Sequence, residues 1–513
     1  MTALTTKPTH TRRRLYGFRH RIVWALATRA PAGRRAKVVF AVLIFLLSYA
    51  TKSLQAVDLA PAMYTIEQPM GGLTETYDQR ATSILDGEGL LGPYDIKPSR
   101  TIWLAQAPGY SIFLSAVYRI FGRDFYKVQA AQNALNSLSP VLIFLIAGLV
   151  VSWRVGVVSG LLAAISHHLG HISNFILPDS LSALPVLAGM LLLALASRLR
   201  GRRFKSYLLY AAAGLMFGLA SWMRSQVMML APFLFVALTL AATRRLPVVK
   251  RAAVMVAATV LAIAPITIRN YIVYGEFVPI NIGVGIVMWE GIADASGDRF
   301  GAVAKDDEVA RQEAVLYNNP RYAGTWSSPD GIQRDRDRVN KSLDIIRQHP
   351  LWYAGVMIGR MREMVKYSAH APLVYKISES GARQQTAPIK PGWEEMVTGG
   401  SSLAIGESLF WMRPALRAAQ RIVKEGMLPL IIIGAVVLFI ASLKRGLFIS
   451  AVPLYYLLFQ SLMHTEFRYT LPMQYLVFVF AAIAWVLIGA LVYDAIRRVI
   501  NRKPKSHEAQ AAA

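Results

Sequence analysis

The chain has 513 residues, of which 54% are hydrophobic, a formal net charge of +26 and a mean hydropathy of +0.38. Long apolar runs separated by short basic loops exclude an ordinary soluble globular protein and indicate an all-α polytopic membrane protein. The chain has no cysteine, which excludes disulfides and thiol chemistry.

The N-terminal segment, residues 1–37, carries ten Lys or Arg and no acid. No A-x-A-like cleavage site follows the first apolar run, so we expect an uncleaved cytoplasmic tail. A span needs roughly 20 mainly apolar residues. On this basis the sequence predicts about ten transmembrane helices, over residues 38–56, 127–151, 155–173, 178–197, 206–222, 226–243, 250–268, 427–443, 446–462 and 470–493.

Four short loops between these spans carry basic residues and no acid. Cytoplasmic loops are enriched in Lys and Arg, so the loops are predicted to be cytoplasmic, together with both termini, residues 1–37 and 496–513. This placement explains the positive net charge without nucleic acid, which we do not expect as a partner. The basic residues of the four loops include Arg154, Arg198, Arg203, Arg245, Arg251, Lys444 and Arg445.

Two long polar segments then remain on the outer side, residues 57–126 and 269–426. The first, within an N-terminal transmembrane module of residues 38–268, is expected to carry the chemistry. The second is predicted to form a helical periplasmic cap before the C-terminal transmembrane helices of residues 427–495. Predicted helices of the cap are Arg334–Gln348 and Leu351–Ser368, the second with Pro350 as its start signal.

The first outer segment contains two predicted surface helices. Ala81, Ile84 and Leu85 recur at helical spacing and are followed by Gly87 and Gly89, which indicates an amphipathic helix on the membrane surface. The stretch from Ala107 to Gly122 has a Pro-Gly turn and an apolar run shorter than a span. We interpret it as a helix in or on the outer leaflet.

Ionisable residues at the outer ends of the spans are candidate functional residues. Three arginines on the outer side, Arg224, Arg269 and Arg468, run against the positive-inside rule. The guanidinium fork suits phosphate, and lipid phosphates are present at this level of the membrane. Other candidates at the same level are Asp58, Glu75, Asp78, His167, His168, His171, Asp179, His464 and Glu466.

Several of these candidates have a second interpretation. Glu75 and Asp78 are three residues apart and share a helix face, where they are either a catalytic base and its neighbour or a solvated surface. Asp179 is equally suited to cap the helix that it begins. His167 and His171 share a face that suits a metal, but no third ligand is near in sequence. No metal or other cofactor is therefore predicted to be required.

Five motifs occur in order along the chain: "YDQRATSILDGEGL", "APGYSIFLSAVYRIFG", "APITIRNYIVYGEFVPI", "DIIRQHPLWYAGVMIGRMREM" and "FRYTLPMQYLVFVFAA". With these motifs the chain resembles the polytopic glycosyltransferases that use polyprenyl-phosphate sugars, which include the protein O-mannosyltransferases and the aminoarabinose transferase of lipid A. The resemblance implies a GT-C fold and a lipid-linked donor. It also implies direct inverting transfer to a hydroxyl of a glycan, lipid or protein acceptor.

The resemblance also implies roles for particular residues. Arg269 and Arg468 match the family motifs as they stand and are implied contacts of the donor phosphate, with Arg224 as a further candidate. Leu73 occupies the position at which family members commonly have the catalytic aspartate. The base is therefore sought in Asp78 first, then in Glu75, then in Asp58.

Two other classes of membrane protein share some of these features. An O-antigen ligase or polymerase also uses polyprenyl carriers, but takes a diphosphate-linked oligosaccharide. A lipid or sugar transporter would need polar residues at the span centres, whereas several spans are almost purely apolar there. The sequence thus predicts a cell-envelope glycosyltransferase of a bacterial inner membrane, active at its periplasmic face, with neither sugar nor acceptor identified.

Overall fold

The computed structural model describes residues 33–68, 71–88, 104–199, 203–242, 245–365, 387–397 and 400–500. Over these residues the secondary structure is helical apart from an isolated β-bridge between Thr65 and Ile389. The predicted all-α class is therefore confirmed. Most of both basic tails, and parts of two basic loops, lie outside the described residues.

Seven helical stretches of the described chain are long and apolar enough to cross a membrane. The other three predicted spans are shorter or interrupted. Residues 155–173 form a broken helix, residues 226–243 correspond to a short apolar helix, and residues 446–462 lie in an 18-residue helix that contains Pro453. The polytopic architecture is confirmed, whereas the count of ten spans stays a prediction. The seven stretches are Arg34–Leu59, Phe125–Val150, Asp179–Ala196, Phe204–Met223, Arg245–Tyr274, Phe410–Ala441 and Phe467–Arg497.

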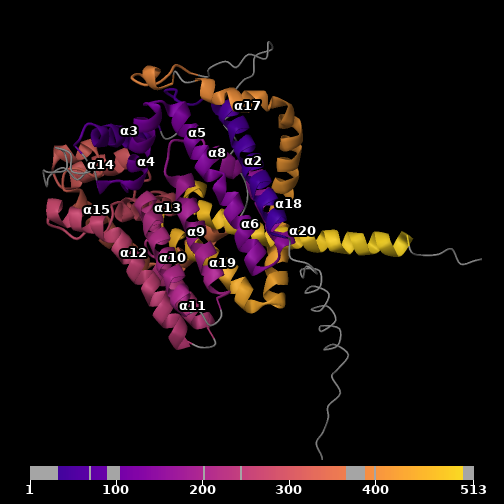
Figure 1. Ribbon diagram of the computed structural model, residues 1–513. Helices are drawn as coiled ribbons and strands as arrows, with labels where there is room; N and C mark the ends of the chain where they lie inside the picture. The colour runs from indigo at the N-terminus through magenta and orange to yellow at the C-terminus, as the bar shows by residue number, and fades with distance from the viewer. Residues whose placement is uncertain are drawn as a thin grey trace, which may run out of the picture.

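Most helices of the bundle lie side by side, with α3 and α4 at one end and α11 at the other, whereas the C-terminal part of α20 extends away from the bundle (Figure 1). We call the first of these the α3–α4 end. The bundle helices are α2 (Arg34–Leu59), α5 (Phe125–Asn136), α6 (Leu138–Val150), α7 (Trp153–Ala164), α8 (His167–Ile172), α9 (Asp179–Ala196), α10 (Arg203–Met223), α11 (Leu230–Ala241), α12 (Arg245–Tyr274), α18 (Arg413–Ala441), α19 (Leu443–Gln460) and α20 (Leu471–Ile500).

Small residues bring the bundle helices together. Gly214 and Gly218 lie one turn apart on α10, and a Cβ atom on either would collide with α12, at the Met255 backbone or the Ala262 side chain. Gly434 of α18 likewise leaves no room for a Cβ against the α20 backbone. Close approach at small residues is the usual way in which helices gain packing energy in a membrane, where lipid tails remove the hydrophobic advantage.

The first outer segment forms α3 (Gly71–Leu85) and α4 (Gly109–Phe121), which pack on each other. The chain turns after α3 at Gly87, which has a φ of +84°, as expected. Of the predicted apolar positions, Ala81 is buried and Leu85 is exposed, so the placement of this helix on the membrane surface stays a prediction. The buried face of α3 instead carries Thr74, Tyr77, Asp78 and Arg80, so the protein interior, rather than lipid, receives its polar side chains.

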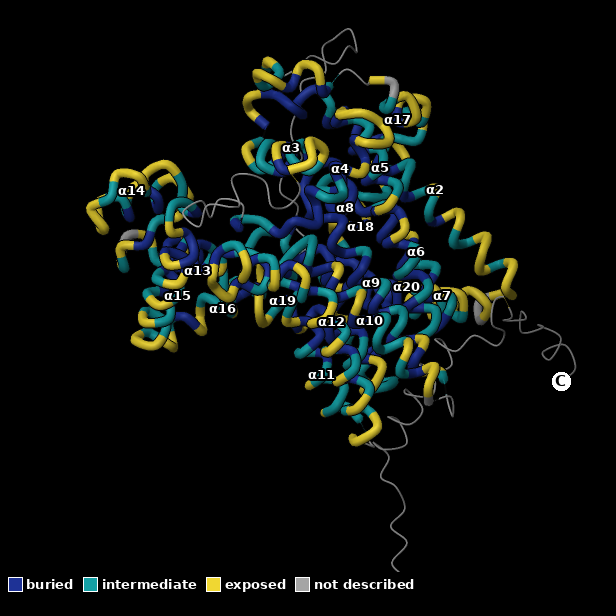
Figure 2. The backbone as a smooth tube through the Cα atoms, turned by 60° about the vertical axis from the view of Figure 1, so that its left-hand side comes forward, coloured by how far each residue is buried: buried dark blue, intermediate teal, exposed yellow. Residues whose placement is uncertain are grey.

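Four helices of the second outer segment form the cap, beside α3 and α4 (Figure 2): α13 (Val284–Ser296), α14 (Asp306–Leu316), α15 (Gly331–Gln348) and α16 (Pro350–Val365). Both predicted cap helices are present, and Pro350 begins α16 as expected. Residues 366–368 of the second prediction lie outside the described residues. The short helix α17 (Ala404–Ser408) packs on α2.

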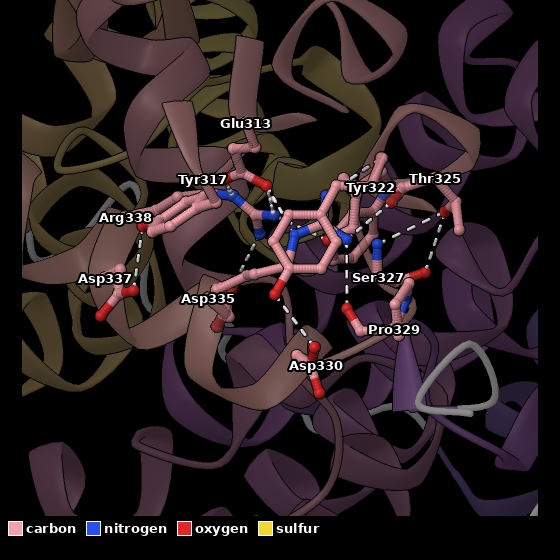
Figure 3. Close-up of polar contacts among 12 residues, drawn as sticks. Glu313, Tyr317, Tyr322, Thr325, Ser327, Pro329, Asp330, Asp335, Asp337 and Arg338 are labelled. Atoms are coloured by element: carbon pink, nitrogen blue, oxygen red, sulfur yellow. Dashed lines mark hydrogen bonds and ion pairs between the residues drawn. The ribbon is translucent and has the colours of Figure 1, made fainter. Parts of the chain in front are cut away.

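A buried carboxylate holds α14 to α15 (Figure 3). Glu313 accepts hydrogen bonds from Arg334 Nε at 2.7 Å and from Arg338 Nε at 2.6 Å. Both arginines also donate to main-chain carbonyls of the preceding loop, including those of Thr325 and Trp326. The cap is therefore ordered by a buried ionic cluster.

Candidate active site

Asp179 lies at the α3–α4 end, at the first position of α9. The expectation that it caps this helix is wrong, because Pro178 is the N-cap residue and no side chain supplies a capping hydrogen bond. The Asp179 carboxylate instead accepts a hydrogen bond from the Arg224 guanidinium, which follows α10. The side chain of Asp179 is 1% exposed, and the positive end of the helix dipole favours its charge.

Polar side chains of α5 hold the start of α9, where Asp179 lies. Gln132 Nε2 donates to the carbonyl oxygens of Ser173 and Phe175, at 2.8 and 2.7 Å. Asn136 Nδ2 donates to Ser180 Oγ at 2.9 Å. The start of α9 is therefore held by buried amides, which gives Asp179 a fixed position in the bundle.

Arg468 lies on the same side of the bundle, just before α20. Its Nη2 atom donates to Glu466 Oε1 at 2.9 Å, and its Nε atom lies 2.7 Å from Glu466 Oε2 in an ion pair. The guanidinium of Arg224 lies over the ring of the neighbouring Tyr469, with Cζ 4.6 Å from the ring centroid. Two arginines from distant parts of the sequence thus share one aromatic ring.

Tyr77 of α3 completes this group. Burial raises the pKa of the Tyr77 hydroxyl to about 12, and its electrostatic environment includes Arg224, Asp179 and Arg468. Asp179 also acts electrostatically on Arg468. We name the group of Tyr77, Asp179, Arg224, Arg468 and Tyr469 the arginine centre.

A cavity of about 110 Å³ lies between α3, α10 and α12. Its walls are mostly apolar, but Arg80 and Arg269 reach it. Arg80 is one turn beyond Tyr77 on the buried face of α3 and donates to the carbonyl of Gln106 at 2.9 Å. Arg269 donates to Asn270 Oδ1 at 2.8 Å. The other lining residues are Leu104, Pro108, Trp222, Pro265, Ile266 and Ile280.

The sequence did not single out Arg80 as a candidate. Arg80 lies in a segment whose acids were the candidate residues. It belongs to the site because it shares a helix face with Tyr77. A basic residue on the outer side, one turn from an aromatic, is the signal that would have identified it.

Asp78, the first candidate base, is buried on α3 and engaged on both oxygens. Arg123 Nε and Nη2 donate to them at 3.1 and 2.5 Å, and Tyr118 Oη donates to Oδ1 at 2.8 Å. Burial and the Asp78 carboxylate raise the pKa of Tyr118 above its usual value. Asp78 therefore links α3 to α4 and to the turn before α5.

The other two candidate bases also have cationic partners. Glu75 pairs with Lys390, and Asp58 pairs with Arg413 at 2.6 Å and with Arg417 at 3.8 Å. Each of the three acids has its own basic partner, different from the arginines of the arginine centre. Asp179 and Glu466 are the acids that the structure brings to those arginines.

The histidines of α8 lie beside one another. The rings of His167 and His171 stack with centroids 6.1 Å apart, and His167 Nδ1 lies 3.0 Å from the side-chain amide of Gln55. In the part of the chain that the structure describes, no three His, Asp or Glu side chains gather as a metal site.

Residues 105–268 match the family described as dolichyl-phosphate-mannose-protein mannosyltransferase. The family resemblance predicted from the motifs is confirmed by this match. It covers Asp179 and Arg224 and ends directly before Arg269, so Arg269 and Arg468 lie outside the matched residues. No curated protein sequence matches the chain.

Solved membrane transferases resemble the chain in structure. The apo oligosaccharyltransferase of Archaeoglobus fulgidus is 14% identical, with a TM-score of 0.48, over 92% of this chain and 53% of that one. The oligosaccharyltransferase AglB of the same organism, in complex with an inhibitory peptide and a dolichol-phosphate, is 15% identical, with a TM-score of 0.46, over 91% of this chain and 52% of that one. The chain spans about half the length of these archaeal chains.

ArnT of Cupriavidus metallidurans bound to undecaprenyl phosphate is 12% identical to this chain, with a TM-score of 0.40. That alignment covers 93% of this chain and 82% of ArnT.

Proposed function

We propose that the protein is a GT-C glycosyltransferase that moves a sugar from a polyprenyl-phosphate donor to a hydroxyl group of an acceptor at the outer face of the membrane. The observation that carries this proposal is the gathering of four arginines, Arg80, Arg224, Arg269 and Arg468, at one end of an apolar helical bundle. The family match over residues 105–268 supports it. A bacterial inner membrane is the proposed location, with both termini in the cytoplasm.

The cavity lined by Arg80 and Arg269 suits the donor phosphate. Arg binds phosphate through paired N–H groups and keeps its charge. The α12 helix, which carries Arg269, has side chains that face away from the protein, with Ile268 58% and Ile272 75% exposed. An isoprenoid chain can lie along this apolar face while its phosphate enters the cavity.

Asp179 is the proposed general base. In the transfer, the acceptor hydroxyl gives its proton to a carboxylate, and its oxygen forms the new bond to the anomeric carbon of the sugar. The bond between that carbon and the phosphate oxygen breaks on the opposite face, which inverts the configuration. The electron pair leaves on the lipid phosphate, whose developing charge is stabilised by preorganised cations.

Asp179 is chosen over Asp78 because it lies in the arginine centre. Asp78 would have to give up Arg123 and Tyr118 before it could accept a proton. The Asp179 carboxylate is hydrogen-bonded to Arg224, and a proton-accepting oxygen at this position lies near the cations that hold the leaving group. The acceptor, whether glycan, lipid or protein, and the sugar are left open by this argument.

The test is lipid binding by the full-length protein in nanodiscs, with undecaprenyl phosphate and undecaprenol as probes. We expect the phosphate lipid to bind, undecaprenol to bind much more weakly, and Arg269→Ala to weaken phosphate-lipid binding by roughly 10-fold or more. Arg311→Ala is the control, since Arg311 is an exposed arginine of the cap paired with Asp307. Equal binding of both lipids would overturn the proposal.

The rival function, an O-antigen ligase or polymerase, differs in its donor. Transfer from a diphosphate-linked oligosaccharide, with none from a monophosphate-linked single sugar, would favour that rival. We expect the reverse, because a cavity of about 110 Å³ with two arginines is matched to one phosphate group.

A further inference from the structure

A chain of charged side chains runs from the cap to Arg468. The carboxylate of Asp294, on α13, contacts Nδ1 of His464. Nε2 of His464 lies 3.6 Å from Glu466 Oε1, and Glu466 holds the guanidinium of Arg468 with both oxygens. Three ionic contacts thus connect a cap helix with an arginine of the arginine centre.

The backbone around His464 is fixed to the cap as well. Its N–H donates to the carbonyl of Val287 at 2.9 Å, and Gly291 leaves no room for a Cβ atom against this backbone. From α16, Tyr353 Oη donates to the Leu462 carbonyl at 2.6 Å and Arg360 donates to the Ser461 carbonyl at 3.0 Å. The loop before Arg468 therefore has one position relative to α13 and α16.

We propose that Asp294 and His464 are positioning residues that hold Glu466, and through it Arg468, for the lipid phosphate, so that donor affinity depends on the cap. This inference rests on the proposed function. It assigns the cap a role in donor binding through named contacts. His464 and Asp294 themselves do not touch the donor in this arrangement.

The charges of the chain explain why His464 matters. Its pKa is raised to about 9 by the Glu466 carboxylate, against the effect of burial, and further by Asp294. Burial would raise the pKa of Glu466, but His464 and Arg468 lower it to about 2. At neutral pH the carboxylates of Asp294 and Glu466 therefore face two cations, His464 and Arg468. Because His464 balances part of the negative charge of Glu466, Arg468 keeps more of its positive charge for the lipid phosphate.

The sign of the pH effect follows from this balance. When His464 loses its proton above pH 9, the chain gains a net negative charge beside a phosphate that is already a dianion, since the second pKa of a phosphate monoester is about 6. Glu290 also faces this cluster, and burial together with Asp306 raises its pKa to about 9, so its ionisation acts in the same direction. Arg360, the other cation against this loop, keeps its charge.

The experiment measures the affinity of full-length protein in nanodiscs for undecaprenyl phosphate between pH 7.5 and 10. For the unaltered protein we expect affinity to fall by about 5- to 10-fold across pH 9, a coupling of ordinary size between linked sites. His464→Gln should bind about 5- to 10-fold more weakly at pH 7.5 and show no further fall at pH 9 beyond a shallow one from Glu290. Asp294→Asn, which retains the shape of the side chain, should lower the midpoint of the fall.

His349→Gln is the matched control, because His349 lies in the same cap and packs on Phe300 with ring centroids 5.0 Å apart. It should leave both affinity and pH profile unchanged. Wild-type affinity and an unshifted profile in both His464→Gln and Asp294→Asn would overturn the inference. If Arg468→Ala also binds normally, the proposed donor site itself is wrong, whereas weak binding by Arg468→Ala alone rejects only the role of His464.

Discussion

Two clusters of arginines differ in what their side chains contact. In the cap, Arg334 and Arg338 face the carboxylates of Glu313 and Asp335, and their N–H groups also donate to loop carbonyls (Figure 3). At the α3–α4 end, Arg224 is paired with Asp179 and Arg468 with Glu466, and two further arginines, Arg80 and Arg269, line a cavity. The first cluster has as many carboxylates as guanidinium groups and joins two helices, whereas the second includes arginines that reach a cavity.

This difference separates a structural cluster from a binding site. Buried ions are costly unless they are paired and hydrogen-bonded, so a cluster with equal numbers of carboxylates and guanidinium groups needs no ligand. Guanidinium groups that line a cavity are suited to bind a phosphate group there. Removing a charge should therefore affect cap folding in one region and ligand affinity or turnover in the other.

The largest effect is expected for Asp179→Asn. Asparagine keeps the shape of the side chain but cannot accept the acceptor proton, so transfer should fall by about 10²- to 10⁴-fold, the usual contribution of general base catalysis. Binding of undecaprenyl phosphate should be retained. Turnover assays with the donor lipid, alongside binding, measure the two effects, and normal turnover would remove Asp179 as the base.

In the cap, Glu313→Ala should destabilise folding. It leaves two buried guanidinium groups without their carboxylate, at a cost of about 3–5 kcal/mol. Amide hydrogen exchange should show lost protection in α14 and α15. Asp307→Ala, which breaks an exposed pair with Arg311, is the control and should cost less than about 1 kcal/mol. Equal exchange in both variants would contradict the structural role of Glu313.

Arg468→Ala should act on affinity rather than on folding. A hydrogen bond to a charged group contributes about 1.5–3 kcal/mol, so the dissociation constant for undecaprenyl phosphate should rise roughly 10- to 100-fold. The thermal unfolding temperature serves as the control and should change little. An unchanged dissociation constant would show that the donor phosphate does not bind Arg468.

The smallest effect on turnover is expected for Asp78→Asn. Asp78 joins α3 to Tyr118 and Arg123, so its replacement should cost about 1–3 kcal/mol of stability and leave turnover per folded molecule within a few-fold. Turnover normalised to folded protein tests this. A stable variant without activity would instead support Asp78 as the base.

The sequence predicted the helical class and most span positions, because each span is encoded locally by about 20 apolar residues. It also singled out Arg269, Arg468 and Arg224 as candidates, because basic residues on the predicted outer side oppose the positive-inside rule; their role stays a prediction. The sequence did not predict which charged side chains pair with one another. The contacts of Asp78 with Arg123, and of Asp179 with Arg224, each join residues 45 positions apart.

Arg80 and the link from His464 to the cap show the same limit. The role of Arg80 depends on which face of α3 the bundle buries, and the apolar pattern of Ala81, Ile84 and Leu85 pointed to another face. The contact between Asp294 and His464 joins residues 170 positions apart. Such contacts arise from tertiary packing and leave no local signal in the sequence.

The most direct test of the central claim is mass spectrometry of the lipid that copurifies with the full-length protein, compared with the Arg269→Ala/Arg468→Ala double variant. We predict undecaprenyl phosphate or its monoglycosylated form with the unaltered protein and a strong reduction in the variant. A diphosphate-linked oligosaccharide in its place, or equal amounts of phosphate lipid in both proteins, would contradict a monophosphate donor held by these arginines.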